Sequence, residues 1–204
     1  MKIILAVLLL TSAILVGFQY SLKYAAASDS MVSAGGNGSK WDSFTPSSVK
    51  IKTGDKVIWS NPMVVSEPHT VTFFKNQSDF APPAAPYSIA KLTELNPLLP
   101  GQNMEPYVIS DKNGTKLVIV DNARQFKPVA IDSSGSNVTY LDNNAIYNMI
   151  GTEKFVNSGW MWPKGLSPPG VLPISNFTVT FEKAGTYNYI CSIHPWMTGI
   201  ITVQ

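Results

Sequence analysis

The sequence contains a single cysteine, Cys191, and only two histidines, His69 and His194. One cysteine cannot form an intramolecular disulfide, so a disulfide framework is excluded as a source of stability. Two histidines are too few to build a histidine-rich catalytic centre beside another metal site. No Ser-His-Asp set and no paired-carboxylate pattern stands out in the chain. We therefore expect that the protein is not an enzyme.

Charged residues are also scarce, at 14% of the 204 residues, against about 25% in ordinary soluble domains. Fifteen Lys and Arg against 13 Asp and Glu give a formal net charge of +2. Such a small charge produces no field that would select nucleic acid or an acidic membrane surface. We expect no nucleic-acid partner, so partner choice must depend on a local surface.

An apolar segment opens the chain. Residues 1–18 carry one Lys followed by mostly Ile, Leu, Val and Ala, which predicts a signal peptide or a membrane anchor over residues 1–27. Cleavage is expected near Ala27; an uncleaved segment 3–20 would tether the protein to a membrane. Both alternatives export the rest of the chain, so we expect an extracytoplasmic protein. Five sequons fit export and predict a glycoprotein, at Asn37, Asn76, Asn113, Asn137 and Asn176.

The sequence from residue 44 onward predicts an all-β domain. Short stretches alternate apolar and polar residues and are separated by Gly- or Pro-containing turns, which is typical of an antiparallel sandwich or barrel. The two stretches at 49–52 and 56–59 flank the turn at 53–55 and predict a pair of strands. The other predicted strands are 69–73, 177–181, 187–190 and 199–203.

The middle of the chain is less regular, and we interpret residues 75–150 as a long insertion. The segment has too few apolar positions to form an independent core. Within it, residues 107–110 and 116–120 predict a hairpin, and residues 88–95 and 143–150 predict short helical segments. The domain thus spans residues 44–204, and the Ser-, Gly- and Asn-rich stretch at 28–43 predicts a flexible linker that precedes it.

The chemistry-bearing residues gather in the heptapeptide 191–197, which holds the only cysteine and one of the two histidines. In a loop between two strands, the three-residue spacing lets Cys191, His194 and Met197 turn toward one point. His69 opens an earlier strand, and sheet pairing can bring it beside this loop. Two His, one Cys and a weak axial Met are the ligand set of blue-copper electron-transfer sites. We therefore predict one mononuclear copper ion at these four residues.

Three alternatives remain beside this prediction. An extracytoplasmic copper carrier or storage protein would treat the ion as cargo. A sandwich with a structural zinc ion would usually draw a hard or thiolate fourth ligand instead of Met. The four residues could also be ordinary core or surface side chains. We interpret Glu67, near His69, as a solvated loop carboxylate, and we assign no role to Met63.

The blocks at 53–61, 68–73 and 184–197 resemble the cupredoxins, the family of plastocyanin and azurin, and the short ligand loop resembles the amicyanin branch. The resemblance implies a Greek-key β-sandwich and a blue-copper protein that shuttles single electrons between extracytoplasmic or membrane redox partners. We expect a monomer. One departure is Thr70, where the family often has an Asn that locks the ligand loop. Gly199 resembles the family's Gly two residues past the axial Met.

The expected route of the electrons follows from the same loop. His194 is flanked by Pro195 and Trp196, and Val64 and Val65 lie on the first ligand loop. An exposed imidazole edge inside an apolar patch would suit brief redox encounters. With a net charge of only +2, we expect transfer rates to depend little on salt.

Overall fold

The structure is a computed structural model that describes residues 28–81, 86–89, 103–110, 117–120, 122–144 and 146–204. The leader predicted over residues 1–27, with its tether at 3–20 and its cleavage site near Ala27, lies outside these residues. Among the residues that are described, no helix is long and apolar enough to cross a membrane.

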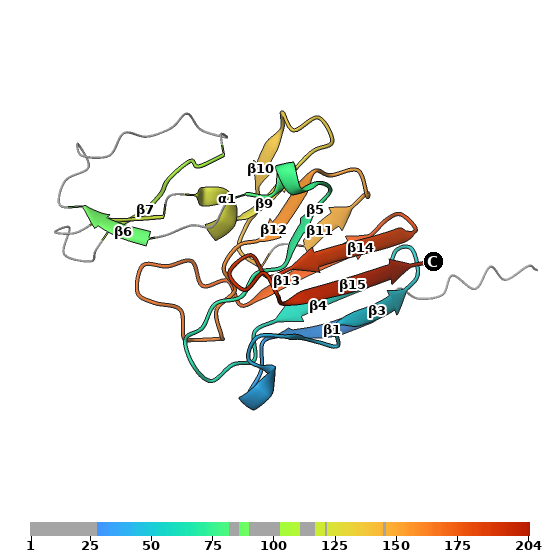
Figure 1. The fold of residues 1–204 in the computed structure, drawn as a ribbon, viewed down its shortest axis with the longest axis horizontal. Coiled ribbons are helices and arrows are strands. Elements are labelled where there is room, and N and C mark those ends of the chain that lie inside the picture. Colours follow the sequence, from blue (N-terminus) through green and yellow to red (C-terminus); the bar gives the residue numbers. More distant parts are fainter. Residues whose placement is uncertain (1–27, 82–85, 90–102, 111–116, 121, 145) are drawn as a thin grey trace, which may run out of the picture.

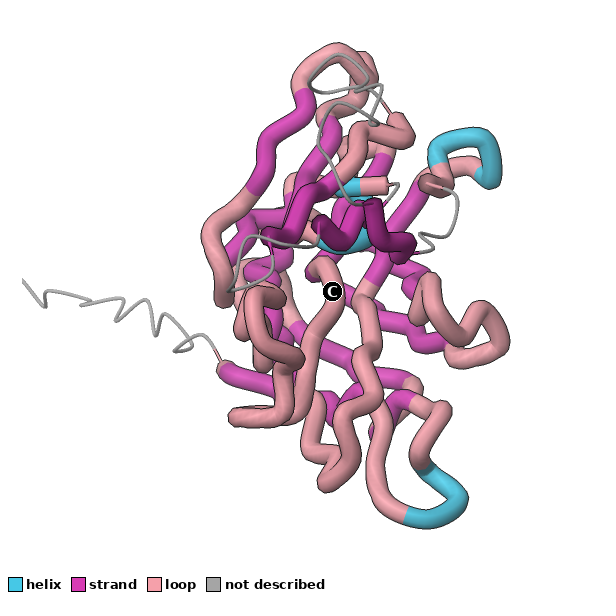
Figure 2. The backbone as a smooth tube through the Cα atoms, turned by 90° about the vertical axis from the view of Figure 1, so that its left-hand side faces the viewer, coloured by secondary structure: helices cyan, strands magenta, loops and turns pink. Residues whose placement is uncertain are grey.

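Two sheets pack against each other and confirm the predicted all-β sandwich (Figures 1 and 2). In spatial order, the five-stranded sheet contains β11 (Ile146–Met149), β13 (Asn176–Phe181), β4 (Lys56–Ser60), β1 (Asp29–Ala34) and β2 (Phe44–Thr45). The seven-stranded sheet contains β10 (Val138–Tyr140), β9 (Pro128–Ile131), β12 (Phe155–Ser158), β5 (Thr72–Phe74), β14 (Gly185–Ile190), β15 (Thr198–Val203) and β3 (Ser48–Ile51). Pairing is mostly antiparallel, with parallel pairs at β1 and β4, β11 and β13, and β15 and β3.

The core between the sheets is aromatic. Alternation along β4 turns Val57 and Trp59 inward, and the Trp59 ring lies 5.9 Å from the Phe73 ring and 5.3 Å from the Tyr189 ring. These three side chains come from both sheets and are buried. Burial of each such side chain contributes about 1.5–3 kcal/mol, so this layer holds the sheets together without a disulfide.

The two strands predicted as a pair at 49–52 and 56–59 lie in different sheets. β3 pairs with β15, whereas β4 pairs with β1 and β13. The turn between them carries the chain across the sandwich: Gly54 has a φ of +89° and its N–H donates to Phe181 O at 2.8 Å. Local alternation predicts a strand but carries no information about its partner, which explains the error.

The segment at 28–43, predicted as a flexible linker, contains strand β1 and the 3₁₀ turn η1 (Gly38–Lys40). β1 runs parallel to β4 and pairs Val32 with Trp59. Val32 and Ala34 are buried, at 1% and 0% exposed. The linker prediction was therefore wrong over β1: neighbouring Ser, Gly and Asn residues mask the two inward positions, and the free edge of β4 supplies the hydrogen bonds.

The region predicted as an insertion contributes strands to all three sheets, with β11 in the five-stranded sheet. The hairpin predicted at 107–110 and 116–120 is confirmed: β7 (Tyr107–Ser110) pairs antiparallel with β8 (Leu117–Val120), and β6 (Pro86–Ile89) flanks β8. β9 and β10 extend the seven-stranded sheet. The region also holds η2 (Gln77–Asp79) and the single turn α1 (Ala123–Phe126).

The two helical segments predicted in this region are not helices where the structure describes them. Residues 146–149 form β11, which pairs in parallel with β13, because an exposed sheet edge offers hydrogen bonds that outweigh a weak helical pattern. Of the segment at 88–95, residues 88 and 89 end β6, and the rest lies outside the described residues.

Candidate metal centre

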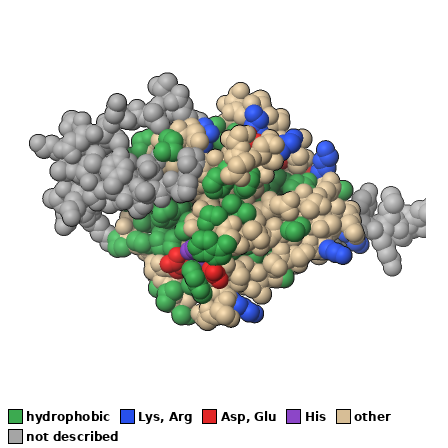
Figure 3. Space-filling view, viewed as in Figure 1, with side chains coloured by type: hydrophobic (Ala, Val, Ile, Leu, Met, Phe, Trp, Pro, Cys, Tyr) green, Lys and Arg blue, Asp and Glu red, His purple; other side chains and the backbone are tan. Residues whose placement is uncertain are grey.

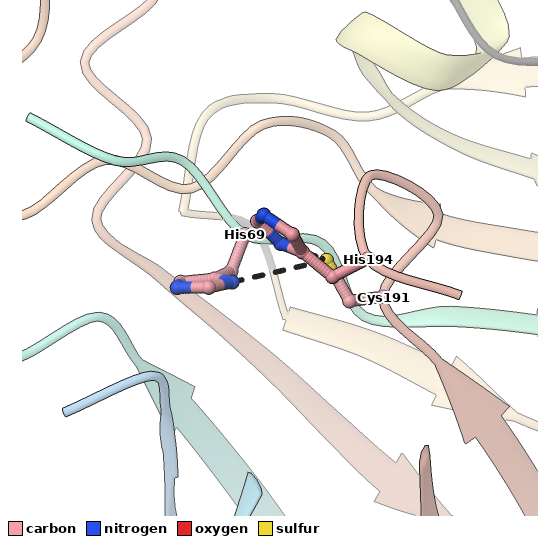
Figure 4. Close-up of side chains that lie close together, drawn as sticks. All are labelled: His69, Cys191 and His194. Carbon is pink, nitrogen blue, oxygen red and sulfur yellow. Dashed lines mark hydrogen bonds between the residues drawn. The ribbon is translucent and has the colours of Figure 1, made fainter. Parts of the chain in front are cut away.

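Three of the four predicted ligands meet at one end of the sandwich (Figure 4). His69 precedes β5 and is held by Met161, whose backbone exchanges hydrogen bonds of 3.0 and 2.8 Å with it. Cys191 follows β14, and His194 lies in the loop before β15. That loop is closed by Cys191 N donating to Met197 O at 2.9 Å and by Met197 N donating to His194 O at 2.8 Å.

The donor atoms have the spacing of a shared metal ion. The Sγ atom of Cys191 lies 3.8 Å from Nδ1 of His69 and 3.6 Å from Nδ1 of His194. Metal bonds of about 2.0–2.1 Å to nitrogen and about 2.3 Å to sulfur, at about 110–120°, place nitrogen and sulfur roughly 3.5–3.8 Å apart. The three residues are buried. A thiolate and two imidazoles in this arrangement fit copper.

Each histidine has a separate partner for its outer nitrogen. Nε2 of His69 lies 3.1 Å from Sδ of Met63, and Nε2 of His194 lies 3.2 Å from Oε1 of Glu67. A partner on one ring nitrogen leaves the other for a metal, so both rings present Nδ1 to the centre. Sequence reasoning missed both partners. Their positions in the loop just before His69 were the available signal.

Burial disfavours the charged forms of His69 and Cys191. It lowers the pKa of His69 to about 4, and the electrostatic interaction with nearby His194 lowers it further. It also raises the pKa of the Cys191 thiol, although a hydrogen bond from the Thr70 backbone opposes the shift. A bound cation would reverse the shift of the thiol pKa, because it stabilises the thiolate. It would bind the imidazole in its neutral form, which burial already favours. The lowered pKa of His69 thus keeps its imidazole in the neutral form that binds a metal.

Thr70 connects the two ligand segments. Its backbone N–H donates to Sγ of Cys191 at 3.3 Å, and its Oγ1 accepts from Ser192 N at 2.7 Å. Both residues are buried beside it. Oγ1 of Thr70 also lies 2.9 Å from Oγ1 of Thr72, which in turn donates to Oδ1 of Asn157 at 2.8 Å. This hydrogen-bond chain runs from the ligand loop into the interior. Thr70 therefore makes the loop-locking contacts that the resemblance would have assigned to Asn.

Met197 lies three residues beyond His194 and is 1% exposed. It packs in the same core cluster as Cys191 and Tyr189. Its backbone closes the ligand loop, as described above. Its role as the axial ligand stays a prediction.

The outer face of the centre is apolar with two carboxylates. Figure 3 shows histidine atoms between acidic groups within an apolar surface. The rings of Trp41 and Trp196 contact His194 edge-on, at 5.5 and 5.4 Å, and Nε1 of Trp196 donates to Asp42 at 2.8 Å. Trp196, in the ligand loop, is 62% exposed, and Trp41, after η1, and Val64 and Val65, in the loop before His69, are exposed as well.

The sequence is similar to known proteins over about a third of its length. No protein-family model matches the sequence. The chain is 31% identical to amicyanin from Paracoccus denitrificans over 70 residues, which is 34% of this chain and 50% of that protein. It is also 31% identical to amicyanin-alpha from Methylorubrum extorquens over 71 residues, 35% of this chain and 56% of that protein. The chain thus spans about half the length of these curated relatives, and the matches confirm the resemblance to amicyanins.

Solved structures are more distantly similar. A variant of amicyanin with Cu(I) aligns with a TM-score of 0.37 and 15% identity over 86% of this chain and 82% of that one. A purple cupredoxin from Nitrosopumilus maritimus aligns with a TM-score of 0.33 and 19% identity over 86% of this chain and 100% of that one.

Proposed function

We propose that this chain is a cupredoxin that carries single electrons through one copper ion bound by His69, Cys191 and His194, with Met197 as a weak axial ligand. The observation that carries the proposal is the placement of both Nδ1 atoms at 3.6–3.8 Å from Sγ, with each Nε2 held by a partner. The similarity to amicyanins over about a third of the chain supports it.

The surrounding residues suit a site that changes redox state without moving. When bound, copper supplies a one-electron couple between Cu(I) and Cu(II), for which mixed sulfur and imidazole donors are suitable. Thr70 and the closed loop at 191–197 keep the thiolate and His194 in place. Burial of His69, at 0% exposed, excludes water from the inner side, while the His194 side chain keeps 8% of its surface exposed. The chain thus supplies a rigid, dry site with one exposed edge.

The test of this function is the behaviour of the copper-loaded full chain. We expect an intense visible band that reductant bleaches and oxidant restores, because thiolate-to-Cu(II) charge transfer produces the band. Reversible cycling together with slow copper loss to a chelator would support electron transfer. Rapid loss to the chelator without a reversible couple would instead indicate a copper carrier or storage protein, and zinc in the purified protein would indicate a structural site.

Met197→Leu should leave the protein blue and raise the reduction potential, by roughly 59 mV for a tenfold change in the one-electron equilibrium. An apolar axial side disfavours the more charged Cu(II), and this effect should exceed the loss of a sulfur donor that favours Cu(I). The potential is measured by a redox titration of the visible band. Met149→Leu is the matched control, since Met149 is as buried, at 2% exposed, and lies on β11. Equal potentials in both variants would mean that Met197 only packs.

We also propose that electrons enter and leave through the exposed patch around His194, formed by Trp41, Val64, Val65 and Trp196. Asp42 and Glu67 lie beside this patch. The rate with a cationic redox partner should therefore fall with salt more than the net charge alone suggests. Partner choice would then depend on this local surface, as the low net charge predicts.

Trp196→Lys should slow electron self-exchange between copies of the copper protein by at least about tenfold, because it places a charge where two apolar patches meet. The rate is measured on half-reduced protein, and the visible band should persist. Ile146→Lys is the control: Ile146 is 61% exposed on β11, compared with 62% for Trp196. If Trp196→Lys exchanges as fast as the wild type, docking occurs elsewhere, and the part of the region at 75–150 away from Ile146 is the next surface to test.

We propose further that the protein works outside the cytoplasm, soluble after cleavage near Ala27 or tethered through residues 3–20. The apolar leader supports export. Of the sequons, Asn37, Asn76 and Asn137 are exposed and Asn176 is partly exposed, so all four could carry a glycan. Asn113 lies outside the described side chains.

A further inference from the structure

We propose that Glu67 is a positioning residue of the metal centre: its carboxylate holds His194 from outside, fixes Nδ1 toward Cys191 and favours Cu(II) over Cu(I). This proposal rests on the copper function proposed above. It concerns a residue outside the ligand set, on the loop between β4 and His69.

The imidazole of His194 bridges Glu67 and the thiol. Its Nε2 lies 3.2 Å from Oε1 of Glu67, and its Nδ1 lies 3.6 Å from Sγ of Cys191. The His194 side chain is 8% exposed and the Glu67 side chain 38% exposed, so the contact lies at the rim of the protein. A ring held at both nitrogens has little freedom to turn away from the metal.

The loop that carries Glu67 is held by a buried asparagine. Asn61, 5% exposed, donates from Nδ2 to Glu67 O at 2.8 Å and to Met161 O at 2.9 Å. Its Oδ1 accepts from Met63 N at 3.1 Å. The Asn61 side chain therefore fixes the backbone of Met63 and Glu67, the outer partners of the two histidines. It also connects their loop to Met161, which holds the backbone of His69. Because its backbone is held by Asn61 and its carboxylate contacts His194, Glu67 is not a freely solvated surface group.

The two histidines have chemically different partners. His69 faces a neutral thioether in the interior, whereas His194 faces a carboxylate. A carboxylate that accepts from a ligating histidine makes the ring more basic, and its negative charge stabilises the more positive metal state. Removal of Glu67 should therefore shift the equilibrium toward Cu(I) and loosen His194.

Asp42 provides a matched control for charge alone. It lies on the same face, where it accepts a hydrogen bond from Trp196 at 2.8 Å, and it interacts electrostatically with His69. Asp42→Asn thus removes one negative charge beside the centre without removing the His194 contact described for Glu67. A difference between the two sites isolates the effect of that contact.

The experiment compares Glu67→Leu, Glu67→Gln and Asp42→Asn in the copper-loaded full chain. Redox titration of the visible band should show at least a tenfold shift toward Cu(I) in Glu67→Leu, equivalent to about 59 mV for one electron. Glu67→Gln, which retains an acceptor oxygen, should lie between Leu and the wild type. Asp42→Asn should shift the equilibrium less than about threefold. The rate of Cu(I) loss to a chelator should be highest in Glu67→Leu, lower in Glu67→Gln and lowest in Asp42→Asn.

Two outcomes separate this proposal from the function on which it rests. A wild-type chain without a visible band or a reversible couple overturns the electron-transfer function. A blue wild type in which Glu67→Leu shifts the equilibrium no more than Asp42→Asn overturns the role of Glu67 alone. Because Glu67 is partly exposed, the metal-free variants should unfold at the same denaturant concentration as the wild type, which shows that any shift is local.

Discussion

Cys191→Ser should abolish the intense visible absorption of the copper-loaded protein and weaken copper binding by more than about 100-fold. The band depends on charge transfer from thiolate sulfur to Cu(II), and a serine hydroxyl remains protonated at neutral pH. Loss of a ligand should exceed the roughly 10–100-fold effect of losing an outer partner. Serine can still accept the hydrogen bond from Thr70 N, which now reaches Sγ at 3.3 Å, so the fold should persist.

The effect is measured by copper titration followed in the visible range and by competition with a chelator. Ser192→Ala is the control, because Ser192 is buried next to Cys191 but contributes its hydroxyl to Thr70 and not to the metal. It should stay blue. His69→Ala should lose the band as well, because it removes one of the three donor atoms that lie close together. A Cys191→Ser protein that remained coloured would refute the site assignment.

Gly35→Ala should destabilise the protein by about 2–5 kcal/mol and disturb the copper spectrum. Gly35 has a φ of +83°, and a Cβ there would lie 2.5 Å from Nε2 of His69 and 2.9 Å from Sδ of Met63. A side chain in the left-handed region costs about 1–2 kcal/mol, and overpacking costs about 1–3 kcal/mol more. The clash also displaces the contact that leaves Nδ1 of His69 free for a metal.

Gly54→Ala separates the two causes. Gly54 has a φ of +89° but nothing lies within 4 Å of its Cβ position, so its replacement should cost only the backbone strain and leave the spectrum unchanged. Free energies of unfolding come from denaturant titration of each variant. Equal losses in the two variants would show that the end of β1 does not lie against His69, contrary to the packing described here.

The centre draws on four separate parts of the chain. The end of β1 and the turn after it cover His69 and His194 through Gly35 and Trp41. The loop held by Asn61 supplies the outer partners, Met161 holds the backbone of His69, and residues 191–197 close the site. Stability and redox behaviour should therefore be coupled, because a change in any of these segments moves a ligand or its partner.

The sequence by itself determined the fold class and predicted the candidate donor set. Only three strong soft or imidazole donors exist, and the spacing of Cys191, His194 and Met197 is a local property that any reader of the chain can measure. Short alternating stretches between turns likewise predict strands without knowledge of their partners. Thr70 could be predicted to support the loop, since it adjoins His69 and offers a hydroxyl and an N–H.

Only the tertiary structure decided which sheet each strand joins and what holds each histidine. β1 was hidden in a polar stretch because its burial depends on β4, whose paired residues lie 27 positions further along the chain, and β11 depends on the edge of β13. The contact of Glu67 with His194 joins residues far apart in the sequence, and the contact of Met63 with His69 depends on the shape of the loop between them. Hydrogen bonds and burial between distant segments form only when the chain is packed, so no local pattern encodes them.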